Sequence, residues 1–257
     1  MRFAIVCTAL CALLAARAAA DEAPPLSEAD LRAMPGATIF AASGVATSTP
    51  QGDAPAVTDP LFGGQYTTAT SVYVREGTQW WLRFTVHCAL RDDLPLARNV
   101  GRLLGAIWRQ AGVRFGTLCA RLRERPVDVW LSRSGAAGGE HWRTDIYLLD
   151  IGSPRTGIEW AREVAHEYGH YLLPGASGYT DPESWANGVL GERLFLWWLQ
   201  RAAQAGSADA ASLPFVSRAD LDDYAAKQVT PLIDREASRA PLSLDGTGVR
   251  PSTPSPR

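Results

Sequence analysis

The sequence predicts an α+β fold in which a mixed or mostly antiparallel sheet packs against helices. Its first half carries short segments rich in Val, Tyr, Trp, Phe and Thr, with one helical stretch among them. Its second half carries three stretches in which apolar residues recur with helical spacing. Strands first and a run of helices afterwards are typical of the α+β class. A chain of 257 residues has room for one domain of ordinary to large size.

Composition excludes two classes of protein. Hydrophobic residues make up 46% of the chain, charged residues make up 20%, and there are nine Trp. Disordered chains are poor in apolar and aromatic residues, so disorder throughout is excluded. The formal net charge of −2 offers no basic field for nucleic acid or for an anionic membrane. We therefore expect no nucleic-acid partner.

The N-terminal residues 1–20 have the pattern of a signal peptide. Arg2 supplies a positive start, and the apolar segment Phe3–Ala16 is too short to span a bilayer comfortably. Ala18 and Ala20 then form an A-x-A cleavage signal. We expect cleavage after Ala20, export to the periplasm or the medium, and no stable membrane insertion afterwards. An uncleaved anchor is the alternative.

Cleavage changes the cysteine count. It removes Cys7 and Cys11 and leaves Cys88 and Cys119. Two cysteines in an exported protein predict one disulfide, which stabilises the fold by about 3 kcal/mol on the chain-entropy model. The alternative is a pair of free buried thiols.

Residues 21–66 are rich in Ala, Pro, Gly, Ser and Thr, and we expect a flexible lead-in with a short helix near Ser27–Met34. Residues 67–240 form the expected domain. Residues 241–257 resemble the lead-in in composition and are expected to be a disordered tail.

The elements of the domain follow from the period of the apolar residues and from turn signals. Glu76-Gly77 separates two apolar runs and predicts a hairpin. Gly112 is expected to end the first long helix, and a glycine-rich loop is expected over Ser134–Glu140. The expected strands are Thr70–Arg75, Gln79–Cys88, Val127–Ser132 and Thr144–Ile151, and the expected helices are Leu96–Ala111, Gly157–Leu173, Pro182–Ala203 and Ser217–Ser238.

The motif that carries chemistry is H-E-x-x-H at residues 166–170. Thr156–Glu159 is a capping-box pattern that starts a helix, and Pro174-Gly175 stops it. His166 and His170 are therefore four residues apart on one helical face, where two imidazoles can hold one Zn²⁺. The chain has only four His, so a chance match on an ordinary helix is a poor explanation.

Glu167 lies about 100° around the helix from His166, close to the metal without needing to bind it. Zinc lowers the pKa of a bound water molecule to about 7. A glutamate in this position removes that proton and delivers it to the leaving amine. Glu167 is therefore the expected general base of a peptidase.

A catalytic zinc site needs a third ligand. The extension typical of metzincins fails, because Leu173 stands where Gly is needed and Ala176 stands where His or Asp is needed. A carboxylate from the helix expected over 182–203 remains. Glu183 and Glu192 are the two candidates, and they face opposite sides of that helix.

Residues 166–170, followed by Glu183–Asn187, resemble the gluzincin family of zinc metallopeptidases. In that family an H-E-x-x-H helix is followed by a helix that carries E-x-x-A-N or E-x-x-x-D. The resemblance covers about Glu159–Trp198 and is that of a minimal catalytic domain. The spacing between the two motifs is shorter than in the large thermolysin-like enzymes, which keeps Glu192 open as a ligand.

The resemblance implies a zincin-like fold, with the metal site on the H-E-x-x-H helix and the following helix. It implies zinc held by His166, His170 and Glu183. It also implies that Asn187 orients one of the zinc-binding histidines.

Weaker signals surround this motif. Tyr179 lies in a loop between the two metal helices and is a candidate donor to the substrate oxyanion, with a surface aromatic as the alternative. His141 is expected to be a polar loop residue, or else to face the cleft. By analogy with resembling enzymes, the strand Thr144–Ile151 is expected to pair with the substrate. Gly188 and Gly191 each cost about 1 kcal/mol inside a helix, which predicts a close approach to the metal helix.

These patterns predict a secreted zinc-dependent peptidase that acts on a peptide or protein substrate. The alternative is a non-catalytic binding or structural protein of the cell envelope that keeps a zincin fold with a vestigial metal site. A closed site with four protein ligands would favour that alternative. The sequence offers no obvious fourth ligand nearby, which favours catalysis.

Overall fold

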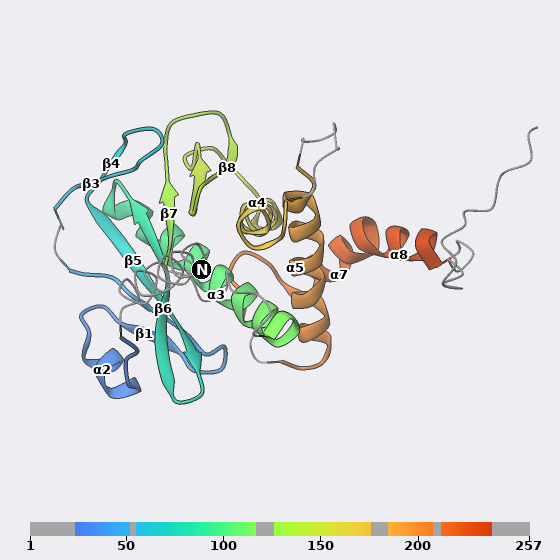
Figure 1. The fold of residues 1–257 in the computed structure, drawn as a ribbon, viewed down its shortest axis with the longest axis horizontal. Helices are drawn as coiled ribbons and strands as arrows, with labels where there is room; N and C mark the ends of the chain where they lie inside the picture. The colour runs from blue at the N-terminus through green and yellow to red at the C-terminus, as the bar shows by residue number, and fades with distance from the viewer. Residues whose placement is uncertain (1–23, 52–54, 117–125, 176–184, 208–211, 238–257) are drawn as a thin grey trace, which may run out of the picture.

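The computed structural model describes residues 24–51, 55–116, 126–175, 185–207 and 212–237. Within these ranges the chain forms a seven-stranded mixed sheet with the long helices packed against one face (Figure 1). A small two-stranded sheet packs through Tyr66 against Trp130 and Tyr147 on the other face. The α+β class and the mixed sheet packed against helices are as predicted.

The elements follow the chain in a simple order. The strands are β1 (Thr38–Phe40), β2 (Val45–Ser48), β3 (Val57–Thr58), β4 (Gln65–Tyr66), β5 (Thr68–Glu76), β6 (Gln79–Cys88), β7 (Val127–Leu131), β8 (Gly138–Trp142) and β9 (Asp145–Leu149). The helices are α2 (Glu28–Ala33), the 3₁₀ turn η1 (Arg91–Asp93), α3 (Leu94–Phe115), α4 (Gly157–Leu172), α5 (Asn187–Gln204), α7 (Arg218–Tyr224), the π-helical segment η4 (Ala225–Val229) and α8 (Thr230–Ala237).

The main sheet has the strand order β1-β2-β5-β6-β7-β9-β8. Neighbours are antiparallel except at β6–β7 and β7–β9, which are parallel. The edge strand β8 falls in the segment expected to be a loop, Ser134–Glu140, and that expectation is wrong from Gly138 onward. Gly138 and Gly139 have low strand propensity, so the strand is stabilised by its pairing with β9 and not by the local sequence.

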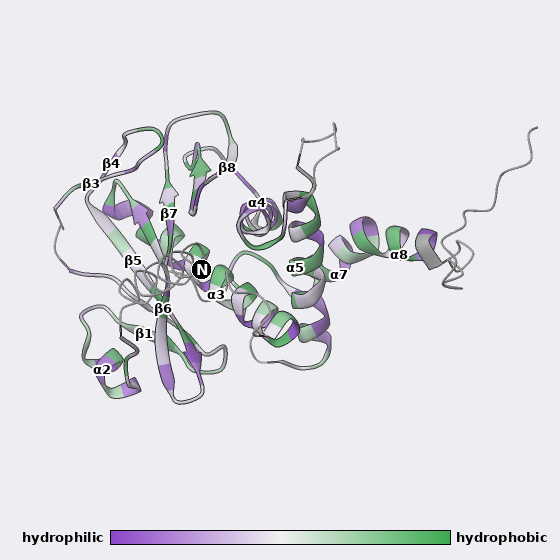
Figure 2. Ribbon diagram, viewed as in Figure 1, coloured by the Kyte–Doolittle hydropathy of each residue, from purple (hydrophilic) through white to green (hydrophobic). Residues whose placement is uncertain are grey.

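The core lies between the sheet and the helices α3, α4 and α5. Every second residue of the central strands faces it: Phe84, Val86 and Cys88 of β6, Val127, Val129 and Leu131 of β7, and Ile146 and Leu148 of β9. Hydrophobic and hydrophilic residues alternate around α3 and α5, as expected for helices with one buried face (Figure 2). The core thus fixes α4 against the β8–β9 end of the sheet.

The segment expected to be a flexible lead-in, 21–66, is structured over its described residues. The short helix near Ser27–Met34 is confirmed as α2, which Ser27 caps by accepting a hydrogen bond from the Asp30 amide. The strand β2 is buried throughout and pairs with β5. Its residues are small, which suits this crowded position, because Val45 packs directly against Gly105 of α3.

Three helical segments differ from expectation. The helix α3 continues past Gly112 to Phe115 and ends at Gly116, whose φ of 55° suits a glycine cap. The helix expected from Pro182 begins only at Asn187. The helix expected over 217–238 contains a π-helical turn between α7 and α8.

Cys88 is a buried, free cysteine at the end of β6, and the disulfide expected between Cys88 and Cys119 stays a prediction because its second member is not described. Burial raises the pKa of the Cys88 thiol to about 12. Cys119, the expected signal peptide 1–20 and the expected tail 241–257 lie outside the described residues. Among the helices that the structure describes, none is both long and apolar enough to cross a membrane.

Candidate metal centre

The helix α4 carries the H-E-x-x-H motif, and its boundaries follow from local chemistry. The Thr156 hydroxyl accepts a hydrogen bond from the Glu159 amide at 3.4 Å, and the Glu159 carboxylate accepts one from the Thr156 amide at 2.6 Å. The helix ends at Leu172, two residues before Pro174. The predicted capping box and stop signal are both confirmed.

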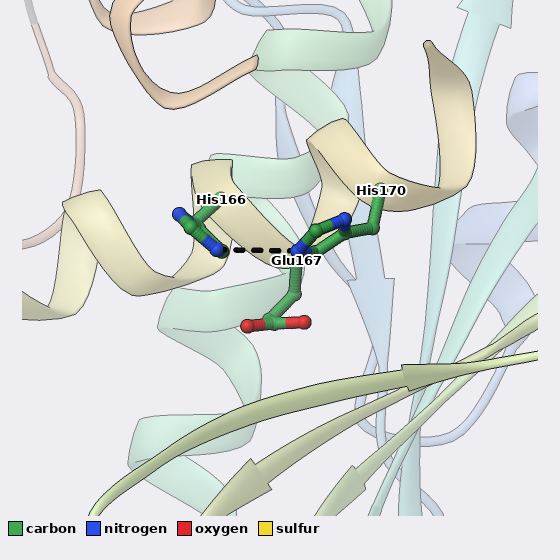
Figure 3. Close-up of side chains that lie close together, drawn as sticks. All are labelled: His166, Glu167 and His170. Atoms are coloured by element: carbon green, nitrogen blue, oxygen red, sulfur yellow. Dashed lines mark hydrogen bonds between the residues drawn. The ribbon is translucent and has the colours of Figure 1, made fainter. Parts of the chain in front are cut away.

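The two histidines of the motif meet through their Nε2 atoms, which lie 3.2 Å apart (Figure 3). Zinc–imidazole bonds of about 2.0–2.1 Å to two nitrogens at this separation subtend about 100–106°, against about 109° for an ideal tetrahedron. His166 and His170 therefore fit the spacing of two ligands on one tetrahedral ion.

Glu167 belongs to the same group. One ligand atom from each of His166, Glu167 and His170 lies within 4.8 Å of the other two, so the group could hold a metal ion. The Glu167 side chain is 5% exposed and its carboxylate lies on the side of the strands (Figure 3). There it meets Gly139 of β8, where an added Cβ would lie 2.5 Å from Oε1 of Glu167. A residue without a side chain is thus needed at this point of the edge strand.

Asn187, the first residue of α5, fixes the orientation of His170. Its Oδ1 lies 2.9 Å from Nδ1 of His170, and its Nδ2 donates to the backbone carbonyls of His170 at 3.2 Å and of Leu173 at 3.3 Å. Because Oδ1 can only accept, Nδ1 of His170 carries the proton and Nε2 presents a lone pair. This is the tautomer that a metal ligand needs.

Glu192 lies behind His166, on the side of its Nδ1 atom. Its Oε2 lies 3.6 Å from Nδ1 of His166, while Oε1 accepts hydrogen bonds from Nε of Arg162 at 2.7 Å and from the Tyr224 hydroxyl at 2.8 Å. Burial alone would raise the pKa of Glu192, but the nearby His166 and the hydrogen bonds from Arg162 and Tyr224 hold that pKa below its usual value. A carboxylate behind a ligand histidine is a common arrangement around zinc.

The helices α4 and α5 cross through glycines. A Cβ at Gly169 would lie 2.8 Å from the Cα of Gly191, and a Cβ at Gly191 would lie 2.3 Å from the Cα of Gly169. A Cβ at Gly188 would lie 2.4 Å from Nε2 of His170 and 2.5 Å from Nε2 of His166. The predicted close approach of Gly188 and Gly191 to the metal helix is confirmed.

The remaining predicted residues divide into two groups. His141 lies in β8 and not in a loop, with its ring centroid 6.3 Å from that of His170 and 6.1 Å from that of Tyr171. It faces α4 because residues 139 and 141 of a strand share one side. Tyr179 and Glu183 lie outside the described residues.

Sequence reasoning missed the outer partner of His166. The sequence presents Glu192 as a candidate ligand or as a solvated helix acid beside Arg193, whereas the structure places it behind Nδ1 of His166. The only sequence signal for this role is its position one helical turn after Gly188, on a helix that also carries Asn187. Comparisons of the chain with protein-family models, curated proteins and solved structures find no match.

Proposed function

We propose that this protein is an exported, zinc-dependent peptidase. The observation that carries the proposal is the pair of Nε2 atoms 3.2 Å apart on one helix, with the Glu167 carboxylate in the same group. Neutral imidazole suits zinc, and the support of both Nδ1 atoms by α5 is the kind of outer shell that zinc sites use. The H-E-x-x-H pattern and its resemblance to gluzincins agree with this donor set.

Zinc bound here would polarise a substrate carbonyl and lower the pKa of a water molecule to about 7. Glu167 would act as the general base, taking a proton from that water and delivering it to the leaving amine. Its burial beneath β8 removes bulk water from the carboxylate and strengthens its interactions. Asn187 and Glu192 would keep the two histidines in the ligand tautomer.

The edge strand β8 offers the peptide a place to bind. It is the last strand of the main sheet and pairs with β9. An extended peptide can add to such an edge through main-chain hydrogen bonds. Gly139 and His141 share the side of β8 that faces α4, so an added peptide would pass beside Glu167. The role expected of Thr144–Ile151 therefore moves to β8, since β9 is an inner strand.

The proposed third ligand is Glu183, as the gluzincin resemblance implies. Glu192 is less suited, because it lies at Nδ1 of His166 and holds two further hydrogen bonds there. Tyr179 remains the proposed donor to the substrate oxyanion, and His141 is a second candidate on the facing strand. Export follows from the signal-peptide pattern of residues 1–20.

The first test is metal stoichiometry by elemental analysis of the mature protein purified without added metal. We expect about one zinc per chain and loss of zinc in His166→Ala. Absence of zinc after incubation of the wild type with Zn²⁺ would overturn the proposal.

The second test is cleavage of a peptide library followed by mass spectrometry. Glu167→Gln keeps the size of the side chain, so it should retain zinc and lose hydrolysis. A zinc-loaded wild type that cleaves no peptide would favour the non-catalytic alternative. A Glu167→Gln variant that cleaves at the wild-type rate would refute the assignment of the base.

A further inference from the structure

The face of the sheet opposite the metal centre holds a pocket of about 380 Å³, which we call the far-face pocket. Its walls include His87 of β6, Asp128 and Trp130 of β7, and Trp142, Arg143 and Asp145 at the β8–β9 turn. The neighbours of these residues, such as Val86 and Val129, face the helices, so the pocket side chains point away from them. The volume lies in the range of small-molecule sites.

The polar groups of the pocket are held in place by one another. Nε2 of His87 lies 2.8 Å from Oδ1 of Asp128, and the His87 ring stacks on Trp130 with centroids 4.0 Å apart. The indole N–H of Trp130 donates to Oδ2 of Asp145 at 3.1 Å. His87 is only 8% exposed and Asp145 only 5%. Groups fixed before binding lose little entropy when a ligand arrives.

Arg143 closes the pocket at a position that its backbone does not favour. Its φ of 58° lies in the left-handed region, where a hairpin turn usually has Gly or Asn. Its guanidinium lies over the Trp142 ring at 4.3 Å from the centroid. A strained non-glycine residue costs about 1 kcal/mol or more, and such residues gather at ligand sites. The positive φ of a residue that lines the pocket therefore supports a ligand-binding role for the Arg143 side chain.

The charges of the pocket select the class of ligand. An anion would meet the carboxylates of Asp128 and Asp145, and a simple cation would meet the guanidinium of Arg143. A hydroxyl group both donates and accepts, so it can bond to the carboxylates, to the guanidinium and to the remaining nitrogen of His87. The partly exposed Trp142 ring lines the pocket and adds an apolar surface for the C–H face of such a ligand. We propose that the far-face pocket binds a neutral saccharide.

The test is isothermal titration calorimetry of the full chain with three neutral probes: cellotriose, maltotriose and chitotriose. A ¹H–¹⁵N spectrum of the indole groups reports on Trp130. We expect at least one probe to bind with a Kd below about 10 mM and to shift the Trp130 resonance. Failure of all three probes at that limit, or binding that leaves the Trp130 resonance unchanged, would overturn the proposal.

Two variants localise the binding. Arg143→Gly relieves the positive φ, so it should fold at least as well as the wild type, and Asp128→Asn keeps the size of its side chain. Each should weaken binding by about 10-fold. Arg75→Ala, which removes an arginine that contacts Trp80 outside the pocket, is the matched control and should have no effect. Equal affinity in the wild type and in both pocket variants would refute the site. His166→Ala should leave saccharide binding unchanged, so this test is independent of the peptidase proposal.

Discussion

Gly188 is the position where one added methyl group should remove the metal without altering a ligand. Its Cβ would lie 2.4 Å from Nε2 of His170 and 2.5 Å from Nε2 of His166. Ordinary van der Waals contacts begin near 3.4 Å, so each ring would have to move by about 1 Å. Metal sites tolerate deviations of about 0.2 Å in ligand distance, and the required shift is about five times larger.

The rings have little freedom to make that movement. Asn187 holds Nδ1 of His170 at 2.9 Å, and Glu192 lies 3.6 Å from Nδ1 of His166. Loss of a single outer partner of this kind costs about 10–100-fold in metal affinity. Gly188→Ala displaces both ligands, so we expect its zinc affinity to fall by at least about 100-fold.

The measurement is competition for zinc against a chromogenic chelator, with a circular-dichroism melt to confirm folding. Gly112→Ala in α3 is the matched control, since its Cβ would meet only Trp108, at 3.9 Å. Both changes improve helix propensity by about 1 kcal/mol, which separates propensity from metal geometry. A folded Gly188→Ala protein that binds zinc within threefold of the wild type would show that the reasoning is wrong.

Three further predictions follow from the same contacts. Gly139→Ala would place a Cβ 2.4 Å from Cγ of Glu167 and so displace the proposed base. The variant should retain zinc and lower kcat by about 100-fold. Steady-state kinetics on a cleaved peptide check this, and an unchanged kcat would contradict it. Asn187→Ala should weaken zinc binding about 10–100-fold by freeing Nδ1 of His170, as measured by the chelator assay. Burial raises the pKa of Cys88 to about 12 from 9.0, so its contribution to stability is complete below pH 9 and declines by up to about 1.4 kcal/mol per pH unit as the pH rises toward 12. Urea unfolding of the wild type and of Cys88→Ala at pH 8 and pH 10.5 tests this, and parallel pH dependence in the two proteins would contradict it.

The metal helix could be predicted from sequence because each signal for it is local. The capping residues Thr156 and Glu159 lie within three positions of each other, and the motif lies on one face of the helix they start. Gly188 and Gly191 also gave a correct prediction, since glycine inside a helix needs a packing reason.

The edge strand and the outer partner of His166 could not be predicted, because both depend on distant parts of the chain. Gly138 and Gly139 form a strand through pairing with β9 and not through propensity. Glu192 reaches His166 only because α5 crosses α4 at this point, and its partner Tyr224 comes from a third helix. His87 carried no signal at all, although it forms a wall of the far-face pocket.

The arrangement of α5 bears on the choice between a catalytic and a structural metal site. A structural zinc site is closed by four protein ligands. Among the described residues, only His166, Glu167 and His170 form a group that could hold a metal, and Glu192 is held at the far nitrogen of His166. Gly188 packs against the two Nε2 atoms so closely that an added Cβ would lie 2.4 Å and 2.5 Å from them, so α5 brings no side chain toward them at this position. If the proposed Glu183 supplies the third ligand, a tetrahedral ion would keep its fourth position for the water molecule that the proposed catalysis requires.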